Sequence, residues 1–283
     1  MTIAAGIPAW TPHPDVWLLV AALVVGYVVA IERLGPRYAA PGRPAVTRFQ
    51  LVCFFLGIFA LWLAADWPIH DVAEKSMYSV HMVQHLMFSM LAAPLMLLGT
   101  PAWLMRWILR PPSRLFRVVR WLARFVPALV LYNVVLVLTH WPVVVNQSLT
   151  SAPLHFTLHS VLFVSSLIVW LPVISPMPEL PRLPPLARSV FLFAWSVLPT
   201  IPASFLTFGA HPLYSAYDHL PKLFGATALE DQQIAGLIMK LGAGALLWAL
   251  IAVIFFRWAA EEERHNQPQL RRQMDRELSE MGL

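Results

Sequence analysis

Charged residues are scarce in this chain of 283 residues. Asp, Glu, Lys and Arg make up 12% of it and hydrophobic residues 58%, whereas an average soluble domain is roughly 25% charged. So little charge cannot cover a globular surface in water, which excludes an ordinary soluble enzyme and a disordered protein. The net charge of +5 does not indicate a nucleic-acid partner either, because the arginines lie between apolar runs, as they do in membrane proteins.

Cysteine is almost absent as well. Cys53 is the only one, which excludes an internal disulfide and any redox or metal site built on paired thiols. The sequence also lacks a glycine-rich phosphate loop, a nucleophile motif and an internal repeat. With no catalytic motif present, we expect a protein that is not an enzyme.

Long apolar runs are what the chain has instead. A helix needs about 20 apolar residues to cross the roughly 30 Å of hydrocarbon in a bilayer. Seven runs approach or reach this length, at residues 16–31, 49–65, 79–98, 126–145, 154–171, 187–208 and 234–256. They predict an all-α fold, a bundle of seven transmembrane helices within residues 1–258 that is followed by a charged cytoplasmic tail at residues 259–283.

Positive charge is unevenly distributed between the loops. Seventeen of the twenty Lys and Arg residues follow the first, third, fifth and seventh runs, so they all fall on one side of the membrane. The exceptions are Lys75 and Lys222 on the other side and Lys240 inside the last run. Because basic loops stay in the cytoplasm, this asymmetry predicts an outside N-terminus and a cytoplasmic C-terminus.

Three segments on the predicted cytoplasmic side have patterns of their own. After Pro112 and Ser113, arginines recur at helical spacing, which predicts a surface helix whose basic side faces lipid headgroups. The proline-rich residues 172–185 predict an extended connector. The tail predicts a helix that is interrupted near Pro268.

Histidine is concentrated on the predicted outer side. Of ten histidines, only His265 lies on the cytoplasmic side, and the other nine are His13, His70, His81, His85, His140, His155, His159, His211 and His219. At a rise of about 1.5 Å per residue, His85, His140, His159 and Lys240 lie at similar depths, roughly 8–9 Å below the outer ends of four runs. Ionisable groups at such depth are costly, and they usually face the bundle interior and serve a function.

Four of the histidines form two pairs with the spacing of metal ligands. His81 and His85 are four residues apart, as are His155 and His159, so each pair lies on one face of a helix. Such a pair can hold one metal ion through two imidazoles, and imidazole and thioether together suit copper. For any single histidine, the alternative is a packing residue that is hydrogen-bonded in the core.

Other polar residues lie near these pairs in the helical pattern. Gln84 is adjacent to His85, and Asp231 shares a helix face with Met239. Gln232, Gln233 and Lys240 lie beside that face. A lysine inside an apolar run needs a partner, which Asp231 or an anionic ligand group could provide, whereas an ammonium next to a metal ion would oppose its binding.

Several sequence blocks occur in a recognisable order from the third run to the seventh, about two-thirds of the chain: SVHMVQHLM at 79–87, APL at 93–95, LGTP at 98–101, HWP at 140–142, His155 with His159, LTF at 206–208, PLY at 212–214 and DQQIAGLIM at 231–239. In their sequence and order these blocks resemble the CtaG family of polytopic membrane proteins, which are assembly factors of cytochrome c oxidase. The His-x-x-x-His and Asp-Gln-Gln blocks are the most specific. Leu158 stands where the family often has an acidic residue, and Lys240 where it often has an aromatic one.

The resemblance implies a multi-pass protein of the bacterial plasma membrane that matures a haem–copper oxidase. Its implied partners are the oxidase subunits, a periplasmic copper donor and the lipid membrane, with no nucleic acid. The leading interpretation is an assembly factor that holds copper transiently at the outer face. The proposed ligands are His81, His85, His140, His155 and His159, with Met77 and Asp231 as further candidates.

Two other functions are compatible with the pattern. Paired histidines on facing helices can ligate haem, which would indicate a haem-b or quinone-binding redox protein. A frame of seven helices also suits a transporter, although no inverted repeat or pair of broken helices supports that function.

Overall fold

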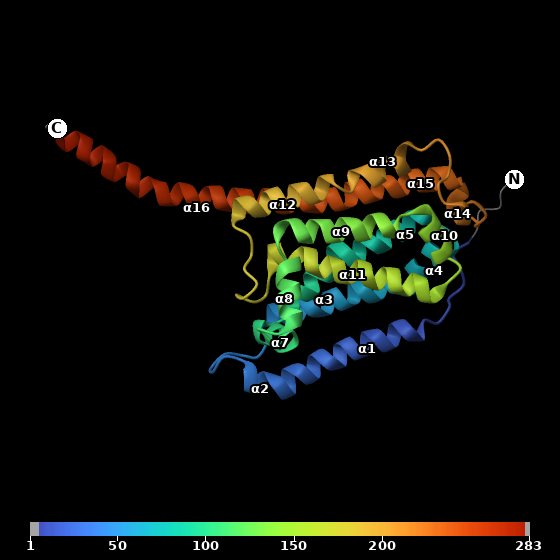
Figure 1. Cartoon of the computed structure of the whole chain (residues 1–283), viewed down its shortest axis with the longest axis horizontal. Helices are drawn as coiled ribbons and strands as arrows, with labels where there is room; N and C mark the ends of the chain where they lie inside the picture. Colours follow the sequence, from blue (N-terminus) through green and yellow to red (C-terminus); the bar gives the residue numbers. More distant parts are fainter. Residues whose placement is uncertain (1–5, 281–283) are drawn as a thin grey trace.

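The computed structural model of the chain describes residues 6–280, and of residues 266–279 it describes the backbone alone. Within these bounds the regular structure is entirely helical (Figure 1). Six helical segments are long and apolar enough to cross a membrane: Pro14–Tyr38, Arg48–Lys75, Tyr78–Gly99, Ala152–Ile174, Pro185–Phe208 and Ala228–His265. A seventh is added if the bent pair Arg114–Leu122 and Phe125–Thr139 forms one span. The predicted all-α class is therefore confirmed, with six or seven candidate spans.

The described residues form sixteen α-helices, most of which are labelled in Figure 1. They are α1 (Pro14–Val29), α2 (Gly35–Tyr38), α3 (Arg48–Ala65), α4 (Ile69–Lys75), α5 (Tyr78–Leu86), α6 (Ala93–Gly99), α7 (Ala102–Leu109), α8 (Arg114–Leu122), α9 (Phe125–Thr139), α10 (Pro142–Ser148), α11 (Ala152–Ile174), α12 (Pro185–Val197), α13 (Thr200–Phe208), α14 (Ser215–Asp218), α15 (Ala228–Leu237) and α16 (Ala243–Glu280). Short π-helical segments, Met87–Ala92 and Ile238–Gly242, join α5 to α6 and α15 to α16.

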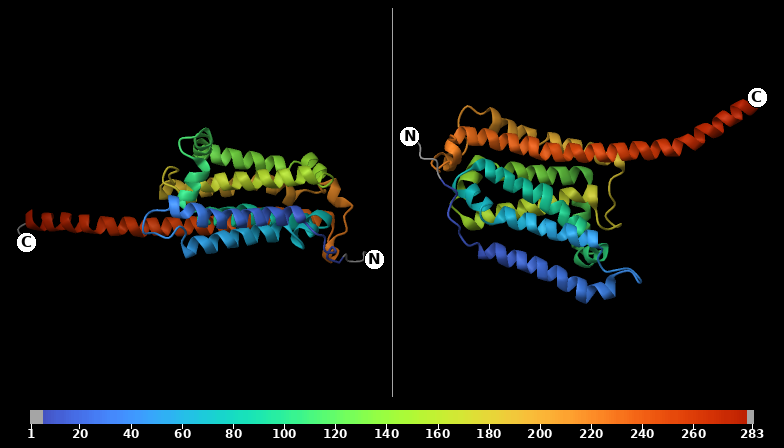
Figure 2. Two further views of the ribbon diagram at one scale, coloured as in Figure 1. Left: turned by 90° about the horizontal axis from the view of Figure 1, so that it is seen from below. Right: turned by 180° about the vertical axis from the view of Figure 1, so that it is seen from behind.

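The short helices gather at two opposite ends of the bundle (Figure 1). We call the end with α4, α10 and α14 the histidine end, and the end with α2, α7 and α8 the arginine end. From the arginine end α16 continues well beyond the bundle, as both views of Figure 2 show. Exposed apolar side chains such as Phe205, Phe208 and Phe256 cover the flanks, a surface that suits contact with lipid.

Prolines determine where several helices end. Trp141 precedes Pro142 and adopts extended backbone angles, because a residue before proline avoids the helical region. The apolar run 126–145 is therefore divided between α9 and α10, and His140 caps the end of α9 instead of lying a turn inside it. The run 187–208 is likewise divided near Pro199 into α12 and α13.

Two expectations for the segments predicted to be cytoplasmic differ from the structure in detail. The predicted interruption of the tail near Pro268 is wrong, because α16 is one helix through that residue. The helix α11 includes Pro172 and ends at Ile174, so the non-helical connector is shorter than the predicted residues 172–185. The predicted helix after Ser113 is confirmed as α8, whose first turn is capped by the Ser113 hydroxyl, 3.1 Å from the Phe116 amide nitrogen.

Close contacts hold α1, α3 and α6 against one another. A Cβ atom on Gly99 would lie 2.5 Å from the Phe54 backbone nitrogen, so only glycine lets α6 approach α3 this closely. Tyr27 of α1 stacks on Phe54 with ring centroids 3.6 Å apart and donates a hydrogen bond to the Gly99 carbonyl. At the other end of α3, the buried Asp66 carboxylate accepts the indole N–H of Trp17 from α1.

Candidate metal centre

Two parallel helices present the histidine pairs. Both α5 and α11 begin at the histidine end, and His81 and His155 are the fourth residues of their helices while His85 and His159 are the eighth. A common rise per residue therefore brings the two pairs to matching depths. The rings follow this geometry, with centroids 5.7 Å apart for His81 and His155 and 5.1 Å apart for His85 and His159.

Three of these imidazoles surround one point. One ring nitrogen each from His81, His85 and His159 lies within 4.8 Å of the other two. Imidazole nitrogens bind zinc at about 2.0–2.1 Å, so a modest approach of the rings would bring all three to bonding distance of one such ion. The cavity between these rings and His155 has a volume of about 10 Å³, which is the space of one water-sized body. An ion fits there, whereas a haem would require the helices to separate.

Seven buried ring nitrogens of the histidines have no hydrogen-bond partner among the described residues. They are His81 Nδ1, both nitrogens of His85, His140 Nε2, both nitrogens of His155 and His159 Nε2. Of these, His155 Nδ1 lies 3.2 Å from a Glu74 carboxylate oxygen but without the geometry of a hydrogen bond. Leaving a buried polar atom unpaired costs about 1–3 kcal/mol, and such atoms are rare in proteins. A packing histidine would be hydrogen-bonded instead, so this cluster has the chemistry of a ligand set.

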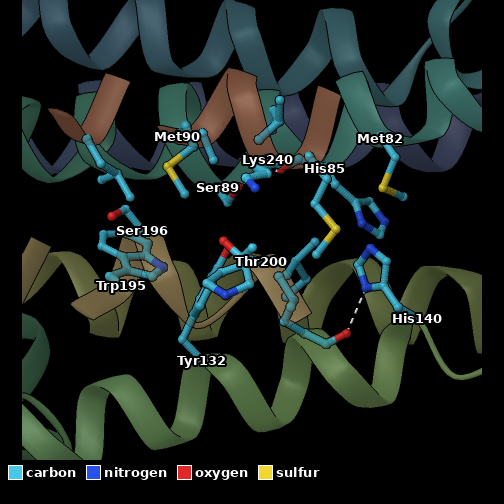
Figure 3. Close-up of a pocket in the computed structure, with 17 residues that line it drawn as sticks. Met82, His85, Ser89, Met90, Tyr132, His140, Trp195, Ser196, Thr200 and Lys240 are labelled. Atoms are coloured by element: carbon cyan, nitrogen blue, oxygen red, sulfur yellow. Dashed lines mark hydrogen bonds between the residues drawn. The ribbon is translucent and has the colours of Figure 1, made fainter. Parts of the chain in front are cut away.

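His140 joins the cluster from the end of α9. Its Nδ1 donates a hydrogen bond to the Leu136 carbonyl at 2.7 Å, which places the proton on Nδ1 and leaves the lone pair on Nε2. Metal-binding histidines are commonly oriented by a bond of this kind. The His140 and His85 rings lie side by side in an edge-to-face arrangement, with centroids 5.2 Å apart and an angle of 79° between their planes (Figure 3).

Asp231 has a positioning role in the structure. Its carboxylate accepts the backbone N–H groups of Tyr78 and Ser79 at 2.7 and 3.0 Å, which satisfies donors that the first turn of α5 leaves free. It also pairs with Lys222 at 3.1 Å, so the lysine that meets Asp231 is Lys222 and not Lys240. Asp231 thereby anchors the helix that carries His81 and His85.

Three of the other predicted site residues, Met77, Gln232 and Gln233, lie in or beside the loops near the histidines. Met77 packs against Val72 and Leu223 in a small apolar cluster. Gln232 accepts the Leu213 amide and Gln233 donates to the Gly209 carbonyl, so both tether the segment after α13. These residues hold the loops that surround the cluster.

Gln84, Met239 and Lys240 lie on other sides of the histidines. Gln84 is fully buried and donates to the Ala64 carbonyl at 2.7 Å, with His70 Nδ1 3.1 Å away. Met239 and Lys240 line a cavity of about 30 Å³ together with His85 and His140 (Figure 3). The Lys240 side chain is exposed, and none of the ion pairs among the described residues includes it.

A second group of ligand atoms was not predicted from the sequence. His70 and Glu74 of α4, together with His155, offer atoms that all lie within 4.8 Å of one another. His70 and Glu74 are four residues apart, so the spacing rule that selected the other pairs could have found them. Residues 69–75 lie between two predicted spans, and the apolar runs alone do not predict the helix α4 that places His70 and Glu74 on one face.

Comparison with known proteins agrees with the motifs in the sequence. No curated protein and no solved structure matches the chain significantly. A family described as cytochrome c oxidase caa3 assembly factor (Caa3_CtaG) matches residues 25–261. This range includes every helix from α2 to α15 and every residue of both ligand groups. Since the match covers most of the sequence, the chain is a multi-pass membrane protein that belongs to the cytochrome c oxidase caa3 assembly factor family.

Proposed function

We propose that this assembly factor holds a copper ion transiently between His81, His85 and His159 and passes it to the copper centre of the oxidase. Copper is cargo here and not a resident cofactor. The observation that carries the proposal is the convergence of three imidazoles from α5 and α11 whose ligand atoms lie within 4.8 Å of one another. His140 and His155 flank this group and supply alternative ligands during release.

The donor set suits a site that must let its ion go. Imidazole is a good ligand for copper, but three neutral rings provide no negative charge and no thiolate to hold the ion tightly. The only cysteine, Cys53, lies buried in α3 with Phe54 and Ile58, away from the residues that line the histidine cavity. Such a centre transfers an ion rather than catalysing a reaction, so the protein acts without enzymatic activity.

The direction of transfer depends on the orientation in the membrane. We propose that the histidine end faces outward from the bacterial plasma membrane, because the basic loops gather at the opposite end. A periplasmic copper donor and the oxidase subunits would then meet this end, with residues 1–258 in or at the bilayer and residues 259–283 as the cytoplasmic tail. Alkaline phosphatase fused after Asn146 should be active and the same enzyme fused after Pro112 inactive, and the reverse pattern would contradict this orientation.

The function is tested by separating loss of copper from loss of protein. His85→Ala should lower oxidase activity in the membrane and the copper content of the purified protein, while the amount of protein stays the same. The matched control is His211→Ala, because His211 is exposed at the same end and lies outside both ligand groups. Added copper should partly restore oxidase activity to His85→Ala, since a higher concentration offsets a weakened site.

A packing role for His85 gives the opposite result. In that case the protein level and the oxidase activity would fall together, and copper would restore neither. That outcome would refute the copper function of this site.

A further inference from the structure

We propose that His70, Glu74 and His155 form a second metal site, at which a copper(II) ion is received before it moves to His81, His85 and His159. The site itself is inferred from its own geometry. Only the statement that its ion continues to the inner group rests on the proposed function.

The three residues are brought together by two helices. His70 and Glu74 share one face of α4, and His155 reaches them from α11. The Glu74 carboxylate lies 3.5 Å from His70 Nε2 through one oxygen and 3.2 Å from His155 Nδ1 through the other. The ring centroids of His70 and His155 are 5.6 Å apart, so both imidazoles and the carboxylate meet in one place.

The chemistry of this group differs from that of the inner one. Two imidazoles and a carboxylate provide one negative charge, and such mixed nitrogen and oxygen sets suit copper(II). Asp71 does not compete, because its carboxylate is already bonded to Lys75, Thr11 and His13. The same bonds balance the charge of Lys75, which would otherwise repel a cation at this site.

An open cavity leads to these ligands. Its volume is about 480 Å³, and both ligand groups reach its wall, since the residues that line it include His70, Glu74, His155 and His159. The side chain of Glu74 is 28% exposed and that of His70 16% exposed, whereas that of His155 is only 5% exposed. An ion from solution therefore meets Glu74 and His70 first and His155 last.

His155 connects the two groups. Its ring lies 4.2 Å from that of His159 and 5.7 Å from that of His81, measured between centroids. An ion held by His155 can exchange Glu74 and His70 for His159 and His81 one ligand at a time, so that each step breaks one metal–ligand bond and forms another. The proposed order is therefore cavity, second site, inner site.

The proposal is tested by counting copper ions on the purified full chain in detergent. Equilibrium dialysis against copper(II) sulfate should give two bound ions for the unmodified chain, one for Glu74→Gln, one for His85→Ala and none for the double variant, because each substitution removes one ligand set. Glu74→Gln keeps the shape of the side chain, and an unchanged melting temperature without copper verifies that the variant is folded. Asp218→Asn is the matched control, an exposed carboxylate in α14 at the same end, and it should retain two ions.

Other results distinguish the two proposals. A single ion that His85→Ala removes and Glu74→Gln leaves in place would overturn the second site and support the proposed function. A single ion that Glu74→Gln removes and His85→Ala leaves in place would support the second site and overturn the inner one. Equal losses in Glu74→Gln and Asp218→Asn would show nonspecific binding to surface carboxylates and overturn the second site.

Discussion

The two ends of the bundle have interiors of opposite chemistry. Toward the arginine end, Trp170, Trp195 and Phe191 are almost completely buried, and Trp195 packs against the other two, with the two indole centroids 5.0 Å apart. The Trp170 indole also donates a hydrogen bond to the Ser89 carbonyl at 2.7 Å. The histidine end instead holds five imidazoles with seven buried ring nitrogens that lack hydrogen-bond partners, whereas one ring nitrogen of the aromatic group, Trp195 Nε1, lacks one. The first interior is built for packing, and the second keeps binding capacity that packing alone does not use.

This contrast shows where stability and function are separated. Dense aromatic packing makes the free energy of unfolding sensitive to the removal of atoms. Unpartnered imidazoles lower that free energy, so their removal leaves little bonding to lose. Substitutions at the two ends should therefore change different measured quantities.

The largest effect on stability is expected toward the arginine end. Phe191→Ala should lower the free energy of unfolding by about 3–5 kcal/mol, because Phe191 is fully buried and its removal leaves a cavity in a dense core. The melting temperature in detergent should fall sharply, whereas copper bound per folded chain should not change. Loss of copper from the molecules that fold would show that the two ends are not independent.

The next largest effect is an increase in stability, and it is expected when copper binds at the histidine end. Copper at about one hundred times its dissociation constant should stabilise the chain by about 2.7 kcal/mol, because the ion binds the folded state. The melting temperature should rise with copper concentration, and the rise should be smaller for His85→Ala. An equal rise in both chains would place the stabilising ion elsewhere.

The third largest effect is expected from a substitution that changes both stability and copper affinity. Asp231→Asn should cost about 1.5–3 kcal/mol, since charged hydrogen bonds to α5 and to Lys222 are weakened. Copper affinity should fall as well, because the N-terminal turn of α5 loses its anchor. Asp218→Asn should change neither the melting temperature nor the copper affinity.

The smallest effect is expected at Lys240. Because Lys240 belongs to none of the ion pairs found in the described part of the chain, Lys240→Met breaks no such contact and should change stability by no more than about 0.5 kcal/mol. Copper affinity should stay constant, or rise slightly when the positive charge near His85 is removed. A large loss of copper would assign Lys240 a direct role that its position does not indicate.

Much of the architecture could be predicted from the sequence because it depends on local patterns. Apolar runs indicate helices long enough to cross a bilayer, and the four-residue spacing of His81 with His85 and of His155 with His159 predicts a shared face in any helix. The end of α9 at Thr139 also depends on a local signal, because Pro142 follows it closely in the sequence, although we expected a longer helix. The family motifs were recognisable for the same reason.

The site depended on contacts between distant segments. Asp231 meets the amides of Tyr78 and Ser79 across more than 150 residues of sequence, and Lys222 reaches Asp231 from a loop that no spacing rule connects to it. The sequence placed histidines at a common depth but could not say which helices are neighbours or which way their faces turn. Only the packed bundle, in which α5 and α11 run in parallel and α4 lies beside them, decides that His81, His85 and His159 meet and that His155 also reaches Glu74. Helix periodicity acts over a few residues, whereas the choice of neighbouring faces is made by packing of the whole chain.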